Sequence, residues 1–452
     1  MAATSDPRIA GLPDLPARTW RLAGPGLVAA GVGVSGELVL WPYIASQAGL
    51  VFLWAAVAGI AVQWLLNTEV ERYALATGET ALSGFGPRWG VALVALAYAA
   101  NLWPAWATAS ATVLTYLFGS GDPRWLAVAV LLAIGVVLTF APVVYVMLER
   151  LVLAKLAALG LLAVLAVVFV IRGHTWAALG SAPRFPSGQL GTTLLLGAMA
   201  YAGGARNLAQ GNWIRDKGYG MGLRKPRLTS ALASHERYHD AAARVVPAGE
   251  LDLARWRRWW RFANVEQAVA FGGVSLVSVV FVSMLAHASV FGSPAVQNAT
   301  GFLKVEGLAL QALAGGWFGY LFWAVAAIAL FVTATGITDY TSRLAADLVK
   351  TRFPRSASES VLYLWLVWAL VGAGVLVLAL GRDQPVRLLT VSAWVASATT
   401  AVYSLLLYRL NTRSLPPAIG PGRARALALV LAGLAFAGLA AVTVQSSVGG
   451  GP

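Results

Sequence analysis

The sequence predicts an all-α integral membrane protein, and three observations support that prediction. Of its 452 residues, 58% are hydrophobic and 12% are charged, about half the charged share of a soluble domain. Apolar runs of about 20 residues, the length that a helix needs to cross a bilayer, recur along the chain. None of these runs alternates in polarity as the strands of a membrane β-barrel do. The absence of cysteine also excludes disulfides, thiolate metal sites and cysteine nucleophiles.

Eleven runs meet the length requirement, so we expect eleven transmembrane helices. In chain order they are Leu22–Ala45, Leu50–Asn67, Trp89–Phe118, Trp125–Leu148, Leu151–Ile171, Leu190–Asn212, Ala268–Val290, Leu308–Thr338, Val361–Leu380, Leu388–Tyr408 and Ala426–Val444.

The positions of Lys and Arg predict the orientation of these helices. With the N-terminus in the cytoplasm, the inner segments contain 26 of the 33 basic residues and the outer segments contain six. Cytoplasmic loops of membrane proteins are enriched in Lys and Arg. We therefore expect a multi-pass protein of the cell membrane, with its N-terminus and the long loop 215–261 in the cytoplasm and its C-terminus outside.

The first and the sixth spans contain glycines beside polar or charged groups near their middle. The first includes residues 31–37 followed by Pro42, and the sixth includes residues 201–207. Glycine destabilises a helix by about 1 kcal/mol, and an ionisable group at this depth costs at least about 2.5 kcal/mol. Non-helical backbone survives there only where it is buried in protein or lines a cavity. We expect both helices to be broken; alternatively, the glycines only allow helices to pack closely.

Helices one and six occupy equivalent positions if a unit of five helices occurs twice. Because one starts inside and six starts outside, the two units would be inverted, as in transporters whose substrate site lies at the repeat interface. The predicted organisation is a cytoplasmic segment 1–21, a first repeat 22–171, a second repeat 190–408 that includes loop 215–261, and a peripheral helix 426–444.

Several short motifs fall at the ends and middles of these spans. They are Gly24-Pro25-Gly26 ahead of Ser35, Gly49 and Trp54, Ala76-Thr77-Gly78, and Thr333-Ala334-Thr335-Gly336 followed by Asp347. The stretch from Gly24 to Arg355 resembles the Nramp family of divalent-metal transporters. This resemblance implies the LeuT-like fold of the amino-acid/sodium symporters, a 5+5 inverted repeat with broken helices 1 and 6.

The chain departs from the Nramp pattern at both central motifs. The family's Asp-Pro-Gly-Asn in helix one appears as Ser35-Gly36-Glu37, and its Met-Pro-His-Asn in helix six appears as Gly204-Ala205-Arg206-Asn207. The chain is more similar to a divergent Nramp-like branch. The motifs shared with that branch are Ser35-Gly36-Glu37 with Pro42, the stretch 215–222, and Asp339-Tyr340-Thr341-Ser342-Arg343.

The expected substrate site lies between the two breaks. Its predicted residues are Ser35, Gly36, Glu37, Tyr201, Gly204, Arg206, Asn207 and Gln210. Among these, Ser35, Glu37 and Asn207 are the predicted metal ligands: they supply oxygen and no sulfur, which suits Mg²⁺, Mn²⁺ or Ca²⁺. The first hypothesis is therefore transport of a divalent cation by alternating access.

Arg206 supports a second hypothesis, because its guanidinium stays protonated and repels a dication. It can pair with Glu37, point away along helix six, or bind a carboxylate or other anion through two hydrogen bonds. The alternative function is symport or facilitated transport of a small organic solute or anion anchored by Arg206. A third hypothesis is a structural Glu37–Arg206 ion pair in a protein with no transport role.

The remaining expectations concern coupling, gating and partners. Spans 89–118 and 361–380 contain no charged residue, so we expect no proton relay through them. Asp339 and Arg343 lie four residues apart on one helix face, where they can form a local ion pair or an inner gate. No motif predicts catalysis or ATP use. We therefore expect a protein that is not an enzyme, with lipid and a transported ion or solute as its partners and without a cofactor, nucleic acid or obligate protein partner.

Overall fold

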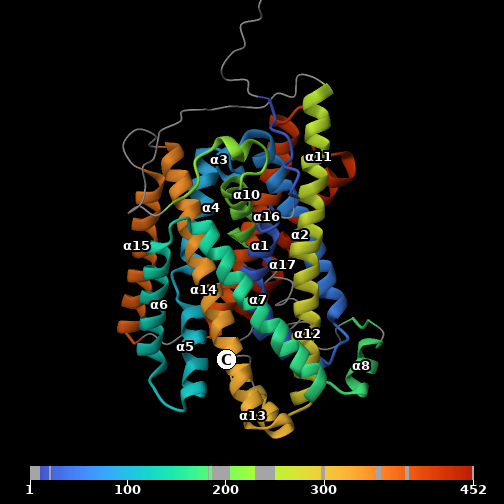
Figure 1. Cartoon of the computed structure of the whole chain (residues 1–452), viewed down its shortest axis with the longest axis vertical. Coiled ribbons are helices and arrows are strands. Elements are labelled where there is room, and N and C mark those ends of the chain that lie inside the picture. Colours follow the sequence, from blue (N-terminus) through green and yellow to red (C-terminus); the bar gives the residue numbers. More distant parts are fainter. Residues whose placement is uncertain are drawn as a thin grey trace, which may run out of the picture.

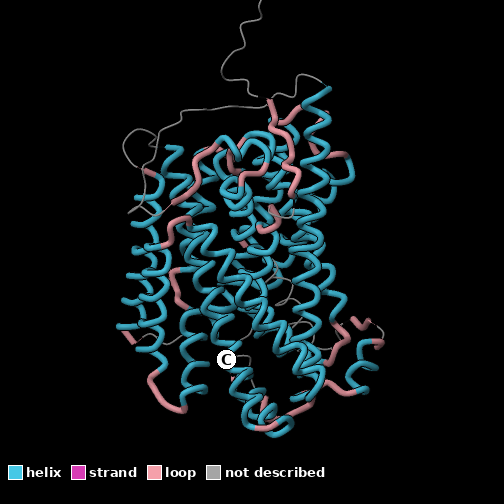
Figure 2. Tube along the Cα trace, viewed as in Figure 1, coloured by secondary structure: helices cyan, strands magenta, loops and turns pink. Residues whose placement is uncertain are grey.

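The computed structural model describes residues 11–19, 22–181, 183–185, 204–229, 250–296, 301–352, 358–381 and 386–449, without the side chains at 34–38, 352, 386–394 and 443–449. Within these ranges the chain consists of helices joined by loops (Figure 2), and its only β-pairing there is an isolated bridge between Val143 and Thr229. The all-α prediction is confirmed.

The helices of the first half are α1 Pro25–Ala48, α2 Leu53–Thr77, α3 Ala81–Gly84, α4 Pro87–Asn101, α5 Ala105–Phe118, α6 Pro123–Phe140, α7 Val144–Phe169 and α8 Gly173–Leu179. Those of the second half are the 3₁₀-helix η2 Ala205–Ala209, α10 Gln210–Lys217, the 3₁₀-helix η3 Gly220–Arg224, α11 Glu250–Glu266, the π-helix η4 Gln267–Gly273, α12 Val274–Val290, α13 Phe302–Ala314, α14 Gly316–Arg352, α15 Glu359–Ala379, α16 Val386–Ser414 and α17 Arg423–Gly449.

Local sequence signals account for several helix ends. Pro25, Pro87 and Pro123 each stand in the first turn of a helix, where the fixed φ of proline suits the helix and its missing N–H is not needed. Gly78 and Gly119 end α2 and α5 in the left-handed conformation, which glycine adopts without a steric penalty.

Eight helical segments in the described part of the chain are long and apolar enough to cross a membrane, so the chain is that of a multi-pass membrane protein. Three predicted spans are corrected in detail. The third is divided into α4 and α5 at Leu102–Pro104. The seventh, Ala268–Val290, lies within a longer helical run from Glu250 to Val290, because α11, η4 and α12 run on from one another, so part of the predicted loop 215–261 is helical. The predicted span 308–338 combines the end of α13 with α14, which are separated at Gly315.

The expected break in the first helix is not observed. The backbone of α1 is helical from Pro25 to Ala48, with Pro42 inside the helix. Its glycines are sites of close packing. A Cβ on Gly31 would lie 2.7 Å from Cγ2 of Val152 on α7, and a Cβ on Gly33 would lie 2.6 Å from Nη1 of Arg206. Tertiary contacts therefore compensate for the low helix propensity of glycine, as the close-packing alternative predicts.

The long helices run roughly side by side (Figure 1). In this view α5, α6 and α15 lie on one side, α11 and α12 lie on the other, and α1, α7 and α14 lie between them. The short elements α3 and α10 lie at one end of the molecule, which is the predicted cytoplasmic end, and α8 and α13 lie at the opposite end. Helix α1 packs against α7, α12 and α14.

Candidate functional site

The sixth span departs from α-helical geometry, as predicted. Gly204 has φ 127° and ψ 171°, and residues 205–209 form the 3₁₀-helix η2 before α10 begins at Gln210. A φ of 127° is accessible to glycine and strained for other residues. The N–H of Gly204 donates to Oγ1 of Thr400 on α16, at 2.6 Å. The departure thus has a sequence cause and is held by a neighbouring helix.

Not all predicted site residues can be placed. Tyr201 lies outside the described residues. Ser35, Gly36 and Glu37 belong to α1, where the structure describes the helical backbone but not the side chains of Ser35 and Glu37. The described members are Gly204, Arg206, Asn207 and Gln210, all on the consecutive elements η2 and α10 or just before them.

A central cavity of about 160 Å³ lies against the Gly204 end of η2. Its walls come from α1, the junction of α4 and α5, η2, α14, α15 and α16. Most of the lining is apolar. The side chains on the wall that carry polar atoms are Asn101, Trp103, Trp106, Arg206, Thr333, Thr338, Tyr340 and Thr399.

Arg206 is the charged residue among those that line this cavity. Its Nη2 donates to Oε1 of Gln63 on α2 at 2.6 Å, and its guanidinium lies against Gly33 of α1. The side chain is half-buried. Among the described residues no carboxylate lies within ion-pair distance of it.

Helix α2 faces η2 and α10 with three polar side chains spaced four residues apart, Gln63, Asn67 and Glu71, so that they lie on one helix face. Gln63 accepts from Arg206. Oδ1 of Asn67 accepts from Nδ2 of Asn207 at 2.7 Å, and Oε1 of Glu71 accepts from Nε2 of Gln210 at 2.7 Å. Each described side chain of the predicted site therefore has a matching partner on α2.

A second buried cation lies near Arg206. Lys155 of α7 is fully buried, and its Nζ donates to the carbonyl of Gly31 at 2.5 Å and to Oγ1 of Thr333 on α14 at 3.4 Å. It thereby links α7, α1 and α14. Together with Arg206, it places two positive charges against α1 between residues 31 and 33.

The predicted Asp339–Arg343 ion pair is present on α14, with Nη2 of Arg343 2.9 Å from Oδ1 of Asp339. Arg343 also pairs with Asp216 of α10, and the hydroxyl of Tyr363 on α15 donates to Asp339 at 2.8 Å. The three charged side chains are fully or almost fully buried. This cluster joins three helices near the end of the molecule where α3 and α10 lie (Figure 1).

A neighbouring network extends the connection between α10, α14 and α15. Arg215 of α10 pairs with Asp347 of α14 at 3.1 Å and with Glu359 of α15 at 2.7 Å. Thr80 donates to the same Asp347. Six charged residues in the two networks thus fasten the three helices to one another.

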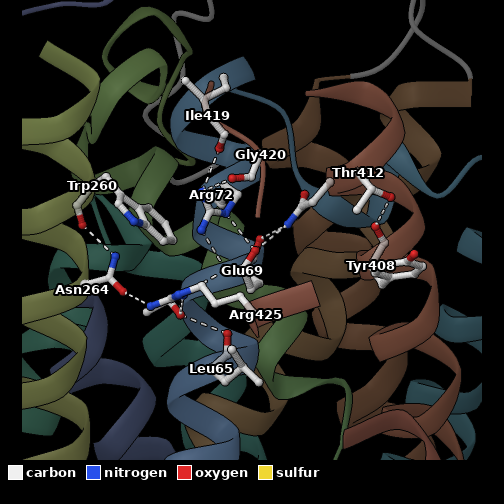
Figure 3. Close-up of polar contacts among 12 residues, drawn as sticks. Leu65, Glu69, Arg72, Trp260, Asn264, Tyr408, Thr412, Ile419, Gly420 and Arg425 are labelled. Atoms are coloured by element: carbon white, nitrogen blue, oxygen red, sulfur yellow. Dashed lines mark hydrogen bonds and ion pairs between the residues drawn. The ribbon is translucent and has the colours of Figure 1, made fainter. Parts of the chain in front are cut away.

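A third polar cluster, shown in Figure 3, joins α2 to α11 and α17. Glu69 accepts from Arg72 and from Arg425, at 2.8 and 2.9 Å. Arg425 also donates to Asn264, and the guanidinium of Arg72 stacks 3.8 Å from the ring centroid of Trp260. Every charge in this cluster has a partner, the cluster residues are not among those that line the cavity, and its contacts join α17 to α2 and α11.

Comparison with known proteins identifies the fold. No protein-family model and no curated protein matches the sequence. Solved structures do match, and the three described below are LeuT-fold transporters. A mutant of the manganese transporter of Eremococcus coleocola matches with a TM-score of 0.72 at 15% identity, over 100% of this chain and 93% of that chain.

Two other solved transporters have the same fold. Mhp1, a nucleobase-cation-symport-1 family transporter with bromovinylhydantoin bound, matches with a TM-score of 0.60 at 13% identity, over 94% of this chain and 92% of its own. MhsT in complex with L-phenylalanine matches with a TM-score of 0.54 at 13% identity, over 96% of this chain and 99% of its own. At these identities the matches show the fold alone.

Proposed function

We propose that this protein is a secondary transporter that moves a small organic anion, with a carboxylate as its charged group, across the membrane by alternating access. The observation that supports this most is the position of Arg206. Its guanidinium has five N–H donors, lines the central cavity, and has Gln63 as its hydrogen-bond acceptor among the described residues. A guanidinium so placed can bind a carboxylate through two parallel hydrogen bonds.

The rest of the cavity suits the body of such a solute. Its lining is mainly apolar, with Ala97, Ile337, Leu370 and Val371 among the contributing residues. Pockets of this kind bind the apolar part of a ligand through burial and orient it through a few polar groups. In this cavity, the hydroxyls from α14 and α16 would orient the solute.

Electrostatics favours an anion over a dication at this position. Arg206 and Lys155 both contact α1 within residues 31–33. One fixed charge about 6 Å from a dication costs roughly 5 kcal/mol at an effective dielectric constant of about 20. Among the described residues, no three carboxylate or imidazole side chains are grouped as a metal site.

A second candidate is transport of a divalent cation by an Nramp-like site made of Ser35, Glu37 and Asn207. The likeness in fold to a manganese transporter favours it. Oδ1 of Asn207 is also buried without a hydrogen-bond partner among the described residues, and a cation can use such an oxygen. The two candidates assign different residues as essential, Arg206 in the first and Glu37 in the second.

The ion pairs around Arg343 are the inner gate of this proposal. They connect α10, which follows the break in the sixth span, to α14 and α15. Release of a solute towards the cytoplasm requires these helices to separate. The buried pairs oppose that separation until the rest of the protein changes conformation.

Transport in proteoliposomes distinguishes the candidates. Purified protein would be assayed for uptake of radiolabelled monocarboxylates and apolar amino acids, and separately of Mn²⁺, with Arg206→Lys, Arg206→Gln and Glu37→Gln alongside the native chain. We expect carboxylate uptake that Arg206→Gln abolishes and that Arg206→Lys reduces, since lysine retains the charge but not the two-pronged geometry. Uptake of Mn²⁺ that Glu37→Gln abolishes, with no carboxylate uptake, would overturn the first candidate in favour of the second.

A further inference from the structure

Five polar side chains form a connected ring that begins at Asn207, the residue directly after Arg206. Asn207 donates to Asn67 at 2.7 Å, Asn67 donates to Gln267 at 3.2 Å, and Gln267 donates to Glu71 at 2.8 Å. Gln210 donates to the same oxygen of Glu71 at 2.7 Å. Asn207 and Gln210, the two ends of this series, lie three residues apart on the η2–α10 segment, whose backbone closes the ring. It connects α2, the η2–α10 segment and the π-helix η4.

The ring leaves three oxygen atoms without a partner. Oε2 of Glu71, Oδ1 of Asn207 and Oε1 of Gln210 are buried and have no hydrogen-bond donor among the described residues. The side chains of all three residues are at most 3% exposed. An unsatisfied buried acceptor costs about 1–3 kcal/mol and a charged one costs more, so this arrangement needs a further group to satisfy these oxygens.

Glu71 also needs a counter-charge. Across the described part of the chain, no basic side chain lies within ion-pair distance of it. The nearby Glu266 adds a second carboxylate, whose Oε1 accepts from the N–H groups of Gly24 and Gly26 at 3.0 and 2.9 Å. Glu266 has the same sign of charge as Glu71, and its hydrogen bonds to the N-terminus of α1 stabilise Glu266 itself, so it provides no counter-charge for Glu71.

A bound metal cation would provide both a counter-charge for Glu71 and a partner for the unpaired oxygens. A proton would provide only the first. Protonation of Glu71 would neutralise its charge but would not supply donors to the amide oxygens of Asn207 and Gln210. A hard cation is bound through oxygen lone pairs, which all three atoms offer. The single negative charge of Glu71, the carboxylate of the ring, balances a monovalent cation. A divalent cation would leave a net positive charge in a buried site, which is costly.

We propose that the Glu71 ring, made of Asn67, Glu71, Asn207, Gln210 and Gln267, is a binding site for Na⁺. Glu71, Asn207 and Gln210 are the predicted ligands, and Asn67 and Gln267 position them. Since the site joins α2 to the segment that carries Arg206, its occupancy fixes that segment against α2. The Na⁺ site is compatible with a carboxylate bound at Arg206, whereas a divalent cation held by Asn207 would compete for the same oxygen.

The test measures Na⁺ binding by the full-length protein in detergent, without any solute. Equilibrium dialysis with ²²Na⁺ gives the affinity. Melting temperature, followed by tryptophan fluorescence, gives the stabilisation when NaCl replaces choline chloride at constant ionic strength. The variants are Glu71→Gln, which removes the charge, and Gln210→Ala, which removes a ligand. Asn212→Ala is the matched control, because Asn212 is also a fully buried amide on α10 but lies outside the ring.

We expect saturable ²²Na⁺ binding by the native chain and a melting temperature that rises with NaCl. Affinity should fall by roughly tenfold or more in Glu71→Gln and in Gln210→Ala, as for losses around other metal sites, and should be unchanged in Asn212→Ala. If Glu71→Gln does not fold, the comparison of Gln210→Ala with Asn212→Ala decides. No ²²Na⁺ binding by the native chain, or equal losses in Gln210→Ala and Asn212→Ala, would overturn the site. Stabilisation by acid without ²²Na⁺ binding would assign a proton to Glu71 instead.

Discussion

Alanine substitutions at Gly31 and Gly33 are expected to have different effects although the two residues lie two positions apart on α1. A Cβ on Gly33 would lie 2.6 Å from Nη1 of Arg206, which is the far end of a flexible side chain. A Cβ on Gly31 would lie 2.7 Å from Cγ2 of Val152 and closer still to its Cγ1. Val152 is fully buried on α7 and has few rotamers with which to move away.

The magnitudes follow from these contacts. Alanine gains about 1 kcal/mol over glycine in a helix interior, whereas overpacking a core costs about 1–3 kcal/mol. Gly31→Ala should therefore be neutral to destabilising by about 2 kcal/mol. Gly33→Ala should retain or gain stability, because Arg206 can shift. That shift should weaken carboxylate binding by roughly tenfold or more, since a hydrogen bond to a charged group contributes about 1.5–3 kcal/mol.

Two measurements on purified protein check this pair. The 18 tryptophans report thermal unfolding in detergent, and isothermal titration with the transported carboxylate reports affinity. Gly31→Ala serves as the control for a general disturbance of α1. Unchanged carboxylate affinity in Gly33→Ala, or a loss of stability as large as that of Gly31→Ala, would refute the reasoning.

Three further predictions concern other parts of the molecule. Asp216→Asn removes one of the two carboxylates that pair with Arg343 and should destabilise the protein by about 1–3 kcal/mol and increase hydrogen exchange in α10; unchanged exchange there would contradict the gate. Burial in α13 raises the pKa of Glu306 well above its usual value, so stability should fall as the pH rises above the usual carboxyl range. Glu306→Gln should remove that fall between pH 5 and pH 8 in melting curves, and an unchanged pH profile would count against it. Arg425→Met should lower stability by about 1–2 kcal/mol through its contacts with Glu69 and Asn264, without an effect on transport.

The general architecture could be predicted from the sequence because composition and span length depend on the bilayer alone. The irregular sixth span was also predictable, since Gly204 supplies a φ that other residues avoid. The same argument was wrong for α1. Glycine propensity measures the cost of a helix in isolation, and it does not include the packing of Val152 and Arg206 against Gly31 and Gly33.

The partners of the site residues could not be predicted, because each lies on a helix distant in sequence. The spacing of Gln63, Asn67 and Glu71 indicates that α2 makes polar contacts, since it places three polar groups on one face of an apolar helix. What they contact depends on how α2 packs against η2 and α10, and a single sequence does not contain that information. Lys155 lies within the predicted span Leu151–Ile171, and its burial between α1, α7 and α14 likewise depends on contacts that the sequence does not reveal.

The central claim is that Arg206 anchors an organic anion in the cavity, and the most direct test is equilibrium binding. Isothermal titration of the native protein with a panel of monocarboxylates and apolar amino acids, and separately with Mn²⁺, should show saturable binding of at least one carboxylate. Arg206→Lys should weaken this binding by roughly tenfold to a hundredfold, the equivalent of about 1.5–3 kcal/mol. Binding of Mn²⁺ alone, or carboxylate binding that is unchanged in Arg206→Lys, would contradict the claim.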